Sequence, residues 1–133
     1  MNTKLVMTLS AAVLALAGLS LTFMPDEIAR LCGISPAPAF TLLLQLLGAL
    51  YFAFAMLNWM AKGSRIGGIY NRPIALANFA HFFIVALAFL KAVINTPQLP
   101  TALWLVAGVY GLFAVLFGLI LFRHPLAEPE VSV

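Results

Sequence analysis

The chain has little that could serve redox or acid–base chemistry. Its single cysteine, Cys32, excludes an internal disulfide and a CxxC redox pair. The quinone-linked four-helix membrane enzymes that form disulfides need paired cysteines, so that class is excluded as well. Only 4 of the 133 residues are Asp or Glu, and none falls inside a long apolar run. Proton-coupled exporters of this size rely on a buried glutamate inside the membrane. Without such a carboxylate, the chain has no obvious proton relay.

Several sequence signatures of enzymes are also missing. The chain has no HExxH zinc motif, no serine–histidine elbow and no paired carboxylates, so hydrolase chemistry lacks its parts. The loop at residues 63–72 lacks the GxxxxGK[ST] arrangement of a nucleotide-binding P-loop. The pI of about 9.4 arises from only 7 scattered Lys and Arg residues. We therefore expect no nucleic-acid partner, no metal and no cofactor.

Apolar sequence is what the chain has in abundance. Hydrophobic residues make up 64% of it, charged residues 8%, and the mean hydropathy is +1.09, far above that of soluble domains. Four apolar runs, at residues 5–24, 40–61, 74–94 and 99–122, are each longer than the roughly 18 residues that can cross a bilayer. The sequence therefore predicts an all-α membrane protein, folded as a four-helix antiparallel transmembrane bundle.

We expect one transmembrane domain over residues 1–123 and a short disordered cytoplasmic tail over residues 124–133, which contains two prolines. The first run has a second interpretation, because Ala15-Leu16-Ala17 before Gly18 resembles the cleavage site of a secretory signal. The run continues through Phe23, which is longer than a usual signal core. That length favours a retained helix.

The basic residues predict the orientation of the chain. Five of the seven fall on one side if the chain crosses four times: Lys4, Lys62, Arg65, Arg72 and Arg123. Arg30 and Lys91 fall on the other side. By the positive-inside rule, we expect a bacterial inner-membrane protein with both termini in the cytoplasm. Lys62, Arg65 and Arg72 flank the glycine-containing loop and are candidate contacts for lipid headgroups; topology alone is the alternative explanation.

The first and third connections carry structural signals of their own. Pro25, Asp26 and Glu27 suit the first turn of a helix, and Gly33 suits its end. We therefore expect a short interfacial helix after the first span, over residues 25–32. The connection at residues 95–100 is short, so the third and fourth spans should be neighbours. Small residues at helix-packing spacing, such as Ala107 with Gly111, could serve the bundle or a homo-oligomer.

Polar residues inside the runs are the candidates for function. Asn78 and His81 are three residues apart and share one face of the third span, while Tyr51 and Asn58 are seven apart and share one face of the second. The four could form a ligand-binding pocket open to the cytoplasm. The alternative is that they hydrogen-bond one another and only hold the helices together, as such side chains commonly do between packed transmembrane helices. We expect no bis-histidine haem within one chain, because His81 is the only histidine inside a run.

The layout also resembles a known group of proteins. The resemblance rests on five segments: residues 23–27 (FMPDE), 45–48 (QLLG), 58–59 (NW), 67–73 (GGIYNRP) and 78–81 (NFAH). In this layout the chain resembles small uncharacterised bacterial four-helix membrane proteins of the DoxX-like group. The resemblance implies a four-helix inner-membrane fold and carries over no catalytic residue.

The sequence leaves three classes of function open. The leading hypothesis is a non-enzymatic membrane protein, either an accessory or assembly subunit of a membrane protein partner or a binder of a lipid-like small molecule. One alternative is an oligomeric transporter or channel with a polar path through Asn58, Asn78 and His81. The other is a membrane enzyme acting on lipid or quinone, with His81 as acid or base.

Overall fold

The computed structural model describes residues 2–64, 66, 68–96 and 98–122, and this part of the chain is all-helical. It contains five α-helices and one short 3₁₀ helix: α1 (Thr3–Phe23), α2 (Pro25–Leu31), α3 (Pro38–Ala61), η1 (Ile69–Asn71), α4 (Arg72–Asn95) and α5 (Ala102–Phe122). Helices α1, α3, α4 and α5 are long and apolar enough to cross a membrane, and they coincide with the four predicted runs. Arg65, Arg123 and the predicted tail at 124–133 lie outside the described residues.

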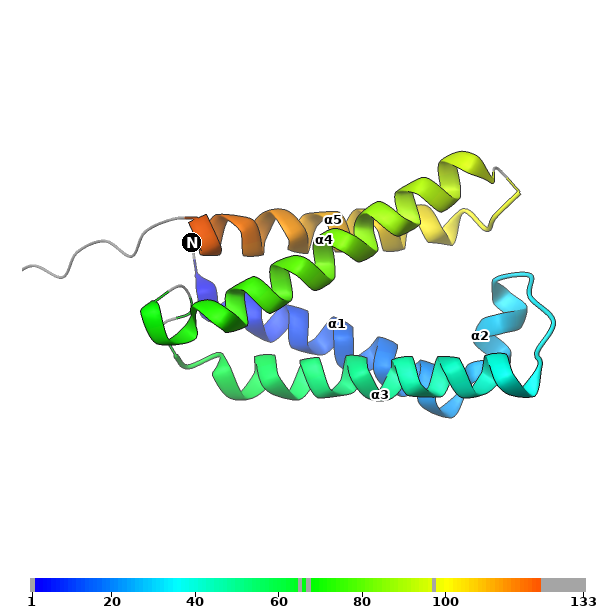
Figure 1. Ribbon diagram of the computed structural model, residues 1–133, viewed down its shortest axis with the longest axis horizontal. Coiled ribbons are helices and arrows are strands. Elements are labelled where there is room, and N and C mark those ends of the chain that lie inside the picture. The colour runs from blue at the N-terminus through cyan, green and yellow to red at the C-terminus, as the bar shows by residue number, and fades with distance from the viewer. Residues whose placement is uncertain (1, 65, 67, 97, 123–133) are drawn as a thin grey trace, which may run out of the picture.

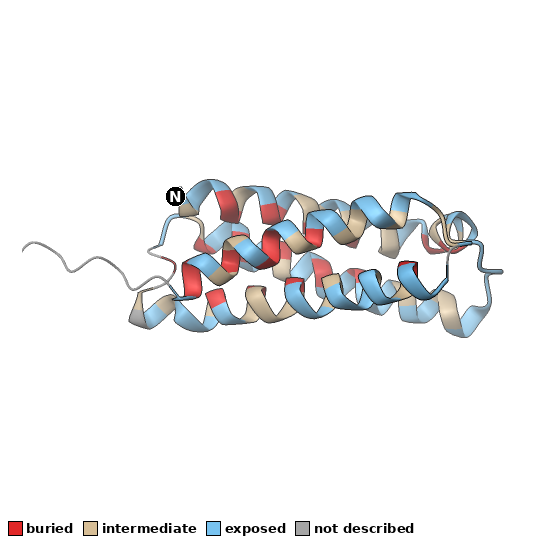
Figure 2. Cartoon of the chain, turned by 90° about the horizontal axis from the view of Figure 1, so that it is seen from above, coloured by how far each residue is buried: buried red, intermediate tan, exposed pale blue. Residues whose placement is uncertain are grey.

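The long helices pack as two pairs, α1 against α3 and α4 against α5 (Figure 1). The third and fourth predicted spans are therefore neighbours, as expected from their short connection. In Figure 1 the two pairs lie closer together at the end where the N-terminus lies than at the end where α2 lies. Figure 2 shows the buried residues concentrated toward the N-terminal end. The packed core between the pairs therefore occupies mainly one half of the molecule.

Two glycines let α1 and α3 approach closely. A Cβ atom added to Gly18 would lie 2.8 Å from the carbonyl oxygen of Gly48, and one added to Gly48 would lie 2.8 Å from the carbonyl oxygen of Gly18. No side chain fits between backbones at this separation, and close backbone contact is how helices associate in lipid. Nearby, the Thr22 hydroxyl donates a 2.8 Å hydrogen bond to the Gly18 carbonyl. The first pair is thus held at its crossing point by glycine.

Aromatic stacking holds the second pair together. Phe82 of α4 is fully buried and stacks on Phe113 and Phe117 of α5, with ring centroids 4.9 Å and 5.6 Å apart. Phe79 of α4 packs against Gly118, where an added Cβ would lie 3.2 Å from the Phe79 ring. From the first pair, Met7 and Leu14 of α1 join the same core with no exposed surface. The aromatic core therefore connects the second pair to α1.

The predicted short helix after the first run is present as α2. Pro25 occupies its first turn, with Asp26 and Glu27 beside it, and Gly33 follows its end with φ of +75°. This left-handed conformation favours glycine, which explains the stop at that position. Asp26 accepts a 2.7 Å hydrogen bond from the Thr41 hydroxyl, so α2 is tied to the first turn of α3.

Candidate functional site

Asn58 and Asn78 form a reciprocal amide pair that joins α3 to α4. The Asn58 Nδ2 donates to Asn78 Oδ1 at 2.7 Å, and the Asn78 Nδ2 donates to Asn58 Oδ1 at 2.8 Å. Asn58 also donates to the Ser10 hydroxyl of α1 at 3.0 Å, and Asn78 donates to the Ile74 carbonyl at 3.0 Å. Three helices from both pairs therefore meet at one hydrogen-bonded centre.

This amide centre is closed. The side chains of Asn58, Asn78 and Ser10 have no exposed surface, and the Ser10 hydroxyl is itself bonded to the Met7 carbonyl at 3.0 Å. Ala75, nearer the start of α4, is also fully buried. Each amide group already has both a donor and an acceptor role filled by protein. The geometry is that of a structural fastening between helices, which is the second of the two interpretations that the sequence leaves open.

His81 lies one turn further along α4, within a ring of aromatic side chains. Its imidazole stacks on Phe54 of α3 at 5.2 Å between ring centroids and meets Tyr51 of α3 edge-on at 5.1 Å. Phe82 lies 5.2 Å away on the same helix, and Tyr110 of α5 lies 5.9 Å away. The structure therefore brings Tyr51 to His81, and Asn58 to Asn78, as two adjacent groups.

One atom of this cluster stands apart from the amide centre. Among the described residues, His81 Nε2 is the buried side-chain nitrogen or oxygen atom that has no hydrogen-bond partner. Buried polar atoms are nearly always paired, because an unpaired one loses its bonds to water and gains nothing in return. The unpaired Nε2 of His81, in a ring cluster with Tyr51 and Tyr110, is therefore the polar atom of the described core that hydrogen bonding within the chain does not account for.

Two of the three candidate headgroup contacts, Lys62 and Arg72, lie in the part of the chain that the structure describes. The Lys62 ammonium lies over the Trp59 ring, 2.8 Å from its centroid, so it is engaged within α3 and its end. Arg72 begins α4 and is exposed beside Leu121 and Phe122 of α5. Arg65 lies outside the described residues. The headgroup contacts therefore stay a prediction.

Two residues of the site were missed in reasoning from sequence. Ser10 lies in the first run and accepts the second proton of Asn58, while Tyr110 faces Tyr51 with ring centroids 6.5 Å apart. Tyr110 is the only tyrosine in the fourth apolar run, which is the one signal that could have identified it. Within the described residues, no group of three or more His, Cys, Asp or Glu side chains could hold a metal ion.

Comparisons with known proteins give no match: no family model, curated protein or solved structure is similar to this chain. The DoxX-like resemblance therefore stays a prediction.

Proposed function

We propose that the chain is a non-enzymatic integral membrane protein, an antiparallel four-helix bundle that binds a lipid-like small molecule beside His81. The four long helices have 21 to 24 residues, which at 1.5 Å per residue gives about 32 to 36 Å, enough for a hydrocarbon core of about 30 Å. Their outward faces are apolar, with Leu16 69% and Leu105 74% exposed. Short connections between successive long helices favour alternating directions.

The orphaned nitrogen of His81 carries the proposal for ligand binding. A buried polar group without a partner costs about 1 to 3 kcal/mol, and a hydrogen bond from a ligand would recover it. Phe54 and Phe82 pack against the imidazole, so two of its neighbours are apolar rings. A ligand suited to this place has one hydroxyl or carbonyl group and an otherwise apolar body. This chemistry describes an amphiphile from the bilayer.

The amide centre supports this interpretation over a polar path through the protein. A channel through Asn58 and Asn78 would need these amides to face a solvated route, but they bond to each other and have no exposed surface. Their role in the proposal is to link α3 to α4 through side chains, so that Tyr51 and His81 keep their positions. In the proposed orientation, inferred from the positive-inside rule, the amide centre lies on the cytoplasmic side of His81.

The test is native mass spectrometry of the protein extracted from its own membranes in mild detergent. We expect the wild type to carry one discrete small-molecule adduct, and the His81→Phe variant to lose it. Ser10→Ala is the matched control, since it removes a polar group from the amide centre and leaves the His81 cluster intact. An adduct that persists in His81→Phe at the same occupancy would contradict the proposal. A stoichiometric protein partner without an adduct would favour an accessory subunit.

A further inference from the structure

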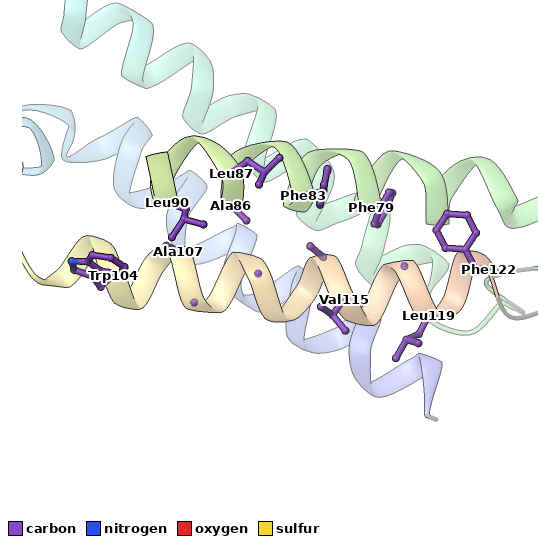
Figure 3. Close-up of a pocket in the computed structure, with 14 residues that line it drawn as sticks. Phe79, Phe83, Ala86, Leu87, Leu90, Trp104, Ala107, Val115, Leu119 and Phe122 are labelled. Atoms are coloured by element: carbon purple, nitrogen blue, oxygen red, sulfur yellow. The ribbon is translucent and has the colours of Figure 1, made fainter. Parts of the chain in front are cut away.

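A long apolar groove runs along the α4–α5 pair and is separate from the His81 cluster. Its volume is about 690 Å³, and all its described lining residues belong to α4 and α5. Figure 3 shows the larger side chains that border it: Phe79, Phe83 and Leu90 from α4, and Trp104, Val115 and Phe122 from α5. A second hollow of about 560 Å³ shares Phe79 and Phe122 with it and is also lined by Arg72. The two hollows lie on either side of the edge-on contact between Phe79 and Phe122, and the second one reaches Arg72, the first residue of α4.

The floor of this groove is left open by glycine. A Cβ atom added to Gly108 or Gly111 would meet no other described atom within 4 Å beyond their own helix and immediate neighbours. Glycine in a helix interior is destabilising relative to alanine, and neither glycine is needed for packing within the chain. In a membrane, a flexible hydrocarbon chain can follow such an irregular apolar hollow.

The charges beside the two hollows are all positive. Arg72 lines the second hollow, Lys91 follows the groove residue Leu90 at the other end of α4, and neither α4 nor α5 contains Asp or Glu. The described carboxylates, Asp26 and Glu27, are on α2 at the opposite end of the molecule (Figure 1). A guanidinium presents several donors in a fixed plane and binds phosphate oxygens in pairs. The hollow next to the apolar groove thus contains, at Arg72, a cation with chemistry suited to a lipid phosphate.

The spacing along α4 fits a lipid in the leaflet nearest Arg72. Phe83 is eleven residues beyond Arg72, about 16 Å along the helix, and half the hydrocarbon core is about 15 Å. An acyl chain below a phosphate held by Arg72 would therefore lie over Phe79 and reach Phe83 near the middle of the bilayer. We infer that the α4–α5 groove is a binding site for one anionic phospholipid, with its phosphate at Arg72 and an acyl chain along Phe79 and Phe83.

The test uses a single tryptophan reporter in the full chain, reconstituted in phosphatidylcholine vesicles. Trp59→Phe and Trp104→Phe remove the native fluorophores, and Phe83→Trp places a reporter in the groove. Phe52→Trp on α3 is the matched control: Phe52 is ten residues before Lys62, at similar depth, and is 40% exposed against 44% for Phe83. Quenching is measured with phosphatidylglycerol and with phosphatidylcholine brominated in their acyl chains.

At the Phe83 reporter, we expect phosphatidylglycerol to be preferred over phosphatidylcholine about fivefold, which is the size of effect one basic residue gives at an anionic surface. The Phe52 reporter should show no such preference. Arg72→Gln should abolish the preference, while Lys4→Gln, which removes one charge from the same end of the molecule away from the groove, should retain it.

Three results would overturn the inference. The first is equal preference at both reporters, and the second is a preference that survives Arg72→Gln. The third concerns the absence of quenching. If neither lipid quenches the Phe83 reporter while both quench the Phe52 reporter, protein covers the groove. The lipid site would then be wrong, and a second copy of the chain would be the occupant to examine. None of these results depends on whether the His81 cluster binds a ligand.

Discussion

Replacing one asparagine of the amide pair by an apolar residue of similar size should destabilise the protein strongly. Asn78→Leu replaces one fully buried side chain by another with the same number of heavy atoms. The change removes both interhelical bonds of the pair, at 2.7 Å and 2.8 Å, and leaves the Asn58 carbonyl oxygen without its donor. The variant therefore loses hydrogen bonds, while the volume of the buried side chain is nearly conserved.

The magnitude follows from the number of bonds. A hydrogen bond between membrane helices contributes about 0.6 kcal/mol on average, so two contribute about 1.2 kcal/mol. The stranded carbonyl of Asn58 adds about 1 to 3 kcal/mol. We expect Asn78→Leu to lower the free energy of unfolding by about 2 to 4 kcal/mol. Asn58→Leu should cost at least as much, because it removes the same two bonds and also the 3.0 Å bond to the Ser10 hydroxyl.

The double variant separates pairing from packing. When both amides become Leu, no buried group is stranded between α3 and α4, and Ser10 keeps its bond to the Met7 carbonyl. The double variant should therefore lose less than the sum of the two single losses, with a coupling energy of about 1 to 2 kcal/mol.

The assay is reversible unfolding in lipid bicelles, followed for the wild type, both single variants and the double variant. Gln45→Leu is a control, since the Gln45 amide is exposed and its bond to the Thr22 carbonyl is 3.4 Å long. We expect that control to change the free energy by under about 0.5 kcal/mol. Strictly additive losses in the double variant would refute a reciprocal pair.

The remaining predictions concern close packing, the orphaned imidazole and orientation. Gly48→Ala should destabilise by about 1 to 3 kcal/mol, because its Cβ would meet the opposing helix at 2.8 Å, while Gly111→Ala, whose Cβ meets nothing, should be neutral or slightly stabilising in the same unfolding assay. In protein stripped of bound small molecules, His81→Phe should raise the unfolding temperature, since it removes an unpaired buried nitrogen; an unchanged or lower temperature would contradict this. In a Cys32→Ala background, a cysteine at Ser64 should resist a membrane-impermeant thiol reagent in intact cells, and brisk labelling would reverse the proposed orientation.

Hydrophobic run length predicted the helices well because it measures a local property. The largest difference at a helix end is at the fourth run, expected from residue 99, whereas α5 begins at Ala102. Pro100 explains this, since it restricts the residue before it and suits the turn before a helix. The stop at Gly33 and the short helix before it were also predictable, because both depend on backbone chemistry at single residues.

Contacts between helices were harder to predict, because they depend on which faces meet. Helical spacing placed Asn78 with His81 on one face, and Tyr51 with Asn58 on another, and the structure joins these faces. Spacing could not show that Gly18 opposes Gly48, because the two are separated by thirty positions and a short helix. It also gave no reason to place Tyr110 beside Tyr51, because a helix that is apolar on every face has no sequence pattern that shows which face packs inward.

The Asn58–Asn78 pair and His81 differ in whether their polar atoms have hydrogen-bond partners in the core. In hydrocarbon a polar group must find its partner within the protein, because water is absent. Asn58 and Asn78 hydrogen-bond each other, so their amide groups are already paired within the protein. His81 lies one turn away among aromatic rings and leaves its Nε2 unpaired. If both groups served only packing, selection for stability alone would favour an apolar aromatic at position 81, because phenylalanine keeps the stacking on Phe54 and strands no nitrogen. Two measurements on His81→Phe therefore distinguish a structural histidine from one that holds a ligand. A ligand-binding histidine predicts a higher unfolding temperature without ligand together with loss of the adduct.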